Sequence, residues 1–160
     1  WGLDDRRRRI LLWLEYGKWS PDEVKQRVLD VNERFKPVKI VVENVAYQDM
    51  IRQDLAADDI PVEGFRTTAG KKFHEESGIA QIAMLMEQSK VVIPTGVKDS
   101  KGYEKVKQLI YEMSTYSYDQ HAGDVLMASW FAFNVLSDFD KKMKDNKTSP
   151  RYLYFNLKEK

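Results

Sequence analysis

The sequence predicts a mixed α/β fold organised around one short apolar strand. Residues 38–45 form a run of mostly β-branched side chains directly after a helical pattern, which is typical of a strand buried on both faces. Strand and helix patterns then alternate along the chain, which favours a sheet covered by helices. A helix that is apolar nearly all round follows near residue 130 and is expected to pack against this sheet.

The other elements follow from local signals. Residues 1–19 predict a β-hairpin with a turn at Asp4-Asp5 and a second strand over 10–16. Ser20, Pro21 and Glu23 make a capping box that starts a helix reaching residue 35. After the apolar strand we expect a helix over 46–55, a strand over 61–66, a loop over 67–72, a helix over 73–88, a strand over 91–94, a helix over 103–113 and the last helix from about 119–124 to 133.

Composition bounds the class of protein. The chain has 160 residues, of which 42% are hydrophobic and 32% charged, as in ordinary globular domains. We therefore predict one domain over residues 1–144 and a polar tail over 145–160. The net charge of +1 excludes a bulk electrostatic attraction to nucleic acid. The absence of cysteine excludes disulfide bonds and thiolate metal sites, which fits a reducing cytoplasm. No signal peptide or membrane-length apolar run is recognised.

Glu43 is the first candidate functional residue. It lies near the carboxyl end of the predicted strand, where functional groups gather in open α/β sheets. An ionised carboxylate that is buried without a partner costs several kcal/mol or more, so we expect a cation, a set of donors or a metal beside it. The alternative is a strand-end glutamate that simply reaches solvent.

Asp124 and His121 form the second candidate group. Both lie at the head of the long apolar helix, where the helix dipole favours the Asp124 carboxylate. A carboxylate and an imidazole are unusual neighbours at the start of a buried helix. The alternative is that Asp124 only caps or charges the first turn.

Four segments together resemble the nuclease domain of tailed-bacteriophage terminase large subunits, the DNA-packaging motors. They are residues 42–48 (VENVAYQ), the pair Lys71-Lys72 before a helix, residues 92–94 (VIP) and residues 121–128 (HAGDVLMA). The resemblance spans roughly residues 1–135. It implies a ribonuclease-H-like fold, with a mixed central sheet of about five or more strands and helices on both faces. It also implies endonuclease cleavage of concatemeric double-stranded viral DNA.

The resemblance also implies a metal site. Glu43 matches the family's second acid and Asp124 its third, while His121 matches a histidine that orients a ligand or the scissile phosphate. Two Mg²⁺ or Mn²⁺ ions about 3.5–4 Å apart would activate a water and neutralise the leaving oxygen. The expected partners are DNA, the ATPase domain of the same full-length chain, the portal and the small terminase subunit, with no membrane, in the cytoplasm of the infected bacterial host.

Three features depart from the family. Its first acid lies on a strand expected upstream of Trp1, and Asp4 and Asp5 are turn residues that do not replace it. Many members carry an acid where this chain has Gly123. The phosphate-binding sequence of the ATPase half, GxxxxGK[ST], is absent.

DNA is expected to be held by phosphate contacts, with little base readout. Our candidates for that surface are Arg66, Lys71 and Lys72. The four arginines over 6–9 are the second choice, because a run of like charges at a hairpin tip is usually a solvated loop rather than a phosphate-binding site. Two other functions stay open. One is another ribonuclease-H-like nuclease, of junction-resolvase or transposase type, and the other is a non-catalytic DNA-binding or docking module.

Overall fold

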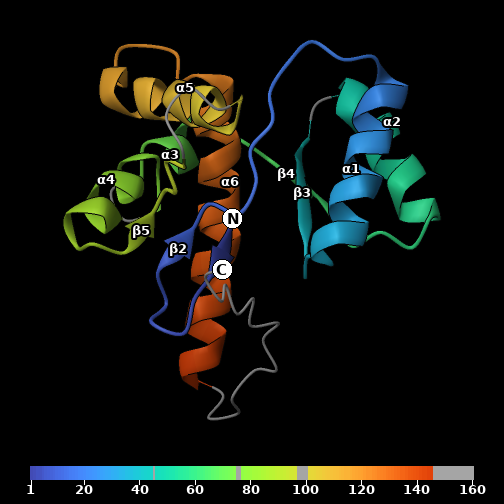
Figure 1. The fold of residues 1–160 in the computed structure, drawn as a ribbon. Coiled ribbons are helices and arrows are strands. Elements are labelled where there is room, and N and C mark those ends of the chain that lie inside the picture. The colour runs from blue at the N-terminus through green and yellow to red at the C-terminus, as the bar shows by residue number, and fades with distance from the viewer. Residues whose placement is uncertain (45, 75–76, 97–100, 146–160) are drawn as a thin grey trace.

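The computed structural model describes residues 1–44, 46–74, 77–96 and 101–145. Within these ranges the protein is a mixed α/β structure with six helices and two small sheets. The longest helix, α6 (Asp124–Asp145), runs through the middle of the molecule, and the other elements lie around it (Figure 1).

The first sheet has three strands in the order β1-β2-β5. β1 (Gly2–Leu3) pairs antiparallel with β2 (Arg9–Ile10), and β2 pairs parallel with β5 (Val91–Val92). The predicted hairpin and the predicted strand near residue 91 are therefore confirmed. The second hairpin strand, predicted over 10–16, is wrong in extent, because the chain leaves the sheet after Ile10 and continues as a linker over residues 11–20.

The second sheet consists of β3 (Ile40–Glu43) and β4 (Val62–Phe65), paired in parallel with Glu43 opposite Phe65. The prediction that residues 38–45 are buried on both faces is wrong. Every residue of β3 is half-buried, and Val38 is 73% exposed. The reason is that β3 is hydrogen-bonded along one edge only. Residue 45 lies outside the described part of the chain.

Helices α1 (Pro21–Phe35) and α2 (Ala46–Ala57) cover one face of this sheet, and α6 lies on the other side (Figure 1). The capping box predicted for α1 is confirmed: the Glu23 amide donates to the Ser20 hydroxyl over 3.3 Å, and the Ser20 amide donates to the Glu23 carboxylate over 2.7 Å. This reciprocal pair satisfies two amides of the open first turn.

The predicted helix over 73–88 is confirmed for residues 80–87 and wrong before them, and the predicted loop over 67–72 is wrong from residue 69 on. The chain instead forms a short helix α3 (Ala69–Lys72), a turn, and then α4 (Ala80–Glu87). Gly78 lies in the turn, and a Cβ there would overlap the carbonyl oxygens of Lys72 and His74. A helix cannot continue through this close backbone approach, so the glycine separates the two helices.

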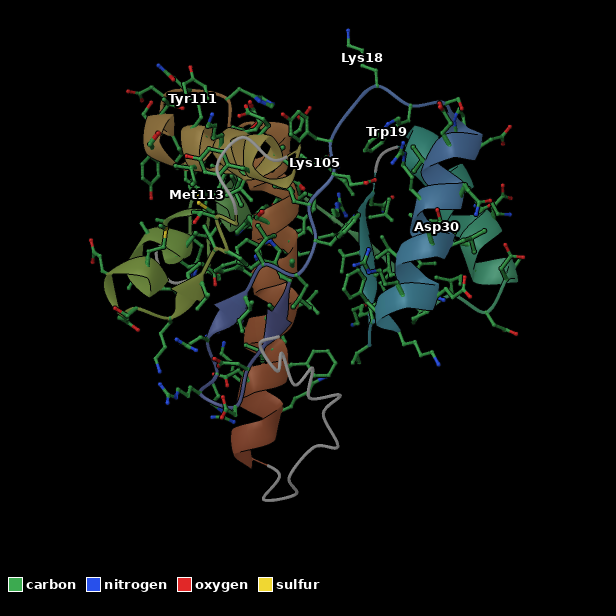
Figure 2. The ribbon with its side chains drawn as sticks, in the orientation of Figure 1. Lys18, Trp19, Asp30, Lys105, Tyr111 and Met113 are labelled. Atoms are coloured by element: carbon green, nitrogen blue, oxygen red, sulfur yellow. The ribbon has the colours of Figure 1, made fainter. Side chains whose placement is uncertain are left out.

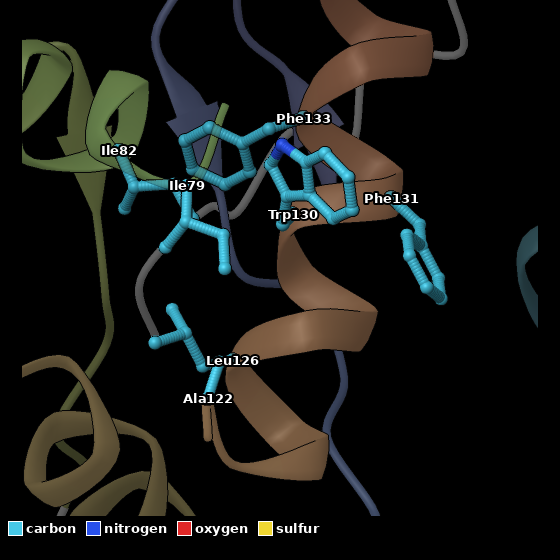
Figure 3. Close-up of a cluster of buried hydrophobic side chains, with 7 residues drawn as sticks. All are labelled: Ile79, Ile82, Ala122, Leu126, Trp130, Phe131 and Phe133. Atoms are coloured by element: carbon cyan, nitrogen blue, oxygen red, sulfur yellow. The ribbon is translucent and has the colours of Figure 1, made fainter. Parts of the chain in front are cut away.

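The main core forms where α6 meets α4 and the loop before α6 (Figure 3). Trp130 and Phe133 are fully buried in it. The Trp130 indole also donates to the Ser77 carbonyl over 2.8 Å, which fixes the turn before α4. The predicted burial of this helix is therefore confirmed. The cluster contains Ile79, Ile82, Ala122, Leu126, Trp130, Phe131 and Phe133.

Helix α5 (Lys101–Thr115) packs across the beginning of α6 and forms a second cluster with the linker. The five strands in the described ranges do not join into one central sheet, which corrects the single sheet expected from the resemblance. The physical reason is that β2 pairs with β5 rather than with β3, and the linker carries the chain from one sheet to the other.

Candidate functional site

Glu43 is the last residue of β3, so its predicted place at the carboxyl end of the strand is confirmed. It lies opposite Phe65, and the next amide, that of Asn44, donates to the Phe65 carbonyl over 2.8 Å. The residue is half-buried, and no cation pairs with it among the residues that the structure describes. Glu43 thus reaches solvent in part, as the alternative to a buried, partnered carboxylate expected.

Asp124 is the first residue of α6, and His121 precedes it by three positions; both are exposed. Asp124 is not the group that caps the helix. The Glu112 carboxylate, from α5, accepts the Leu126 amide over 2.8 Å and takes up that open donor of the first turn. Glu112 thus accepts one open amide of the first turn, while Asp124 lies in that turn as an acidic residue, as the alternative expected.

Glu112 is the residue that sequence reasoning missed. Its second carboxylate oxygen accepts from the Gln108 amide over 2.8 Å, so two hydrogen bonds hold the side chain in place. A Cβ added at Gly123 would overlap the Glu112 carboxylate. A side chain at position 123 would therefore displace the Glu112 carboxylate, which fills the space beside Gly123. The signal in the sequence was the glycine one position before Asp124.

A cavity of about 250 Å³ lies between the end of α5 and the loop that leads into α6. Glu112 and His121 contribute to its polar side, and Tyr111 and Tyr116 contribute aromatic rings. Burial raises the pKa of the Tyr116 hydroxyl, with a further contribution from Tyr118, so Tyr116 stays neutral at physiological pH. The remaining lining residues are Gln108, Thr115, Gln120, Ala122 and Gly123.

The three predicted DNA-contacting residues lie together directly after β4. Arg66 and Lys71 are exposed and Lys72 is half-buried. The Lys71 ammonium lies 5.2 Å from the centre of the Phe65 ring and donates to the Arg66 carbonyl over 3.4 Å. Among the described residues, no ion pair joins a carboxylate to any of these three cations; Glu75 and Glu76, which follow them in the chain, lie outside the described residues.

The four arginines over residues 6–9 do not form a free basic loop. Arg7 pairs with Asp140 of α6 at 3.1 Å, and Arg8 pairs with Asp4 at 2.7 Å. Arg9 is 6% exposed, and burial lowers the pKa of its guanidinium. The side chains tie the hairpin to itself and to α6; the prediction of a solvated loop is wrong for Arg9, whereas the side chains of Arg7 and Arg8 stay 34% and 37% exposed.

The strand that ends with Glu43 and the helix that begins with Asp124 share one end of the molecule. β3 and β4 are parallel, and their carboxyl ends point toward the end at which α6 begins (Figure 1). Phe65 links β4 to α6: its ring centre lies 4.7 Å from that of Phe131 and 5.4 Å from that of Trp130. Glu43 thus stands opposite the residue that docks β4 on α6.

A complete metal cage is not assembled from these residues. Within residues 1–44, 46–74, 77–96 and 101–145, no group of three or more histidine, cysteine, aspartate or glutamate side chains is placed to hold a metal ion. The structure brings Glu43 and Asp124 to the same end of the fold but not into such a group with His121.

Comparison with protein-family models, with curated proteins and with solved structures found no match. Among the described residues, no helix has the length and apolar character needed to cross a membrane.

Proposed function

We propose that this chain is a DNA endonuclease domain of ribonuclease-H-like type, equivalent to the nuclease half of a tailed-phage terminase large subunit. One observation carries the proposal: Glu43 at the end of β3 and Asp124 at the start of α6 lie at the same end of the molecule. The cations Arg66 and Lys71 follow the neighbouring strand β4. Carboxylates from separate elements can hold the divalent ion that promotes phosphodiester cleavage, and basic residues can contact the DNA phosphates.

The two acids fit an open cation site better than a closed cage. Proteins often hold Mg²⁺ through one or two carboxylates, with waters and substrate phosphates completing the shell. Glu43 and Asp124 would hold Mg²⁺ or Mn²⁺ in this way, and both lack an ion-pair partner in the described ranges. A bound divalent ion would activate water and neutralise the leaving oxygen. His121, exposed in the loop before α6, would orient a ligand or the scissile phosphate.

The expected substrate is double-stranded DNA held through its phosphates. A net charge of +1 gives little general attraction for DNA, so the isolated domain should bind weakly. In a full-length terminase the ATPase domain would raise the local DNA concentration without any new contact. The portal and the small terminase subunit would be further partners, in the cytoplasm of the infected bacterial host.

Nicking of supercoiled plasmid tests the proposal. We expect cleavage with Mg²⁺ or Mn²⁺, none in chelator, and a loss of at least about 100-fold in Glu43→Gln and in Asp124→Asn, in line with the large effect of removing charge stabilisation at a reacting centre. The matched control is Glu63→Gln, which changes a carboxylate on the partner strand β4 that pairs with Lys39 at 2.8 Å. Cleavage that persists in chelator, or that survives both substitutions, contradicts the proposal.

A second candidate is a non-catalytic DNA-binding or docking module. The observation that favours it is that the described residues contain no group of three metal-ligating side chains. Calorimetric metal binding without plasmid nicking would select this function. If cleavage occurs, a panel of linear duplex, four-way junction and single strand separates a terminase-type enzyme from a resolvase or transposase type.

A further inference from the structure

Four aromatic side chains lie beside the His121 loop: three have neighbouring rings, and the fourth lines the same cavity as one of them. We call them the aromatic patch: Phe73, Tyr111, Tyr116 and Tyr118. Phe73 stacks on Tyr118 with ring centres 5.3 Å apart and planes inclined by 27°. Tyr118 also lies 6.4 Å from Tyr116, which lines the 250 Å³ cavity together with Tyr111. Figure 2 shows Tyr111 on α5, at the outer surface of the molecule.

Two rings of the aromatic patch are more exposed to solvent than aromatic side chains usually are. Tyr111 is 63% exposed and Tyr118 is 56% exposed, even though Tyr118 contacts two other rings. Aromatic rings normally contribute their large surface to a core or an interface. Since the stacking with Phe73 covers only part of Tyr118, much of that ring remains available to a flat ligand.

Cations adjoin the rings. The Lys72 ammonium lies 5.5 Å from the centre of the Phe73 ring, and Lys71 is the preceding residue. Two exposed carboxylates, Asp119 and Asp124, lie in or next to the same loop. These carboxylates offset part of the local positive charge, so any strand bound here would need ring contacts in addition to phosphate contacts.

We propose that the aromatic patch stacks unpaired bases of a DNA strand while Lys71 and Lys72 contact its phosphates. Stacking on exposed rings flanked by cations is how proteins hold single strands without reading their sequence. The inference rests on the proposed function for its choice of DNA, and it deepens that function: the strand beside Glu43 and Asp124 is locally melted rather than a closed duplex. The cavity beside Tyr111 and Tyr116 accepts one base.

Binding measured in chelator separates this inference from catalysis. Fluorescence anisotropy would compare a labelled single strand of about 20 nucleotides, roughly the length that one or two binding modules cover, with the matching duplex on the full 160-residue chain. We expect the single strand to bind more tightly. Tyr118→Ala should weaken single-strand binding roughly 5- to 100-fold, the effect expected when one stacked base no longer has its ring, and should leave duplex binding within about twofold.

Three controls sharpen the result. Tyr118→Trp keeps a stacking surface and should restore binding, whereas Tyr16→Ala removes a ring that is 44% exposed but outside the patch and should change nothing. Lys71→Ala with Lys72→Ala should reduce the salt slope by about 0.7 for each phosphate that is no longer neutralised, equally for unrelated sequences, while Tyr118→Ala should leave that slope unchanged.

Equal weakening of single strand and duplex by Tyr118→Ala, or no weakening of either, overturns the inference. So does a wild-type preference for duplex. A chain that binds single strands through Tyr118 but does not nick plasmid would retain the inference and overturn only the proposed nuclease activity.

Discussion

Two regions of this molecule are stabilised in different ways. The α6 core comprises α6 and the elements around it, β1, β2, α4, β5 and α5; the β3–β4 unit comprises residues 21–65. Among the residues whose side chains the structure describes, which leave out 46–51 of α2, twelve hydrophobic residues are buried, and one of them, Leu55, belongs to the β3–β4 unit. The other eleven form two clusters that involve α6. Helix α1 has no buried residue although it spans 15 residues.

The β3–β4 unit therefore relies on the core of its neighbour. Val41 and Phe65 project from its sheet onto the α6 cluster, and the Phe65 ring contacts Trp130 and Phe131. Because Glu43 lies opposite Phe65, its position relative to Asp124 depends on this docking. The comparison shows that the candidate site lies across the contact between a well-packed region and a weakly packed one.

The largest expected effect tests whether the α6 core is the stronger region. Phe133→Ala should lower the free energy of unfolding by about 3–5 kcal/mol, because it leaves a cavity in a fully buried site. Leu55→Ala should cost about 2–5 kcal/mol within the β3–β4 unit. Urea denaturation gives the global values, and amide hydrogen exchange shows which amides lose protection.

If the α6 core is the stronger region, Leu55→Ala should accelerate amide hydrogen exchange over residues 21–65 and leave it slow in α6. Phe133→Ala should accelerate amide hydrogen exchange in both regions. Leu12→Ala, at a side chain that is 41% exposed, serves as the control with little effect. Uniform acceleration in Leu55→Ala would mean that the two regions unfold as one unit.

The second prediction concerns the start of α6. Gly123→Ala should cost about 1–2 kcal/mol, because its Cβ must displace the Glu112 carboxylate from the Leu126 amide. Glu112→Ala should cost a similar amount through loss of the same hydrogen bond. Both changes remove the same hydrogen bond, between the Glu112 carboxylate and the Leu126 amide. The double variant should therefore be no less stable than Glu112→Ala alone. Additive losses in thermal or urea denaturation would show that Gly123 and Glu112 act separately.

The smallest effect concerns a charged link between the two regions. Glu15 in the linker accepts a hydrogen bond from Arg27 of α1 and another, over 3.3 Å, from Lys105 of α5. Lys105 extends from α5 toward this linker (Figure 2). Burial raises the pKa of Glu15, but the hydrogen bonds and charges of Arg27 and Lys105 outweigh it and leave the pKa below its usual value of 4.5.

A carboxyl with a depressed folded-state pKa adds stability above its unfolded pKa and loses it as the pH falls through the folded-state value. Glu15→Gln should therefore cost about 0.5–1 kcal/mol at neutral pH, reduced by the partial exposure of both cations, and almost nothing at about pH 2, where both forms are neutral. Urea midpoints across this range measure the difference, with Glu104→Gln as the surface control. A pH-independent difference would assign the effect to packing instead.

The sequence by itself determined the features that depend on neighbouring residues. Ser20 and Glu23 lie three positions apart, so their mutual hydrogen bonds define the start of α1 in any context. The apolar run around residue 41 formed a strand with Glu43 at its carboxyl end, and the apolar helix began at Asp124. The chemistry proposed for Glu43, Asp124 and His121 remains a prediction from sequence.

Only the tertiary structure decided which strands pair and which side chains meet. β2 pairs with β5, about 80 residues later, rather than with β3, and Arg7 meets Asp140 from the other end of the chain. Glu112 reaches Gly123 because α5 packs across the start of α6. Local patterns do not encode such contacts, because their free energy appears only when distant segments share one packed core.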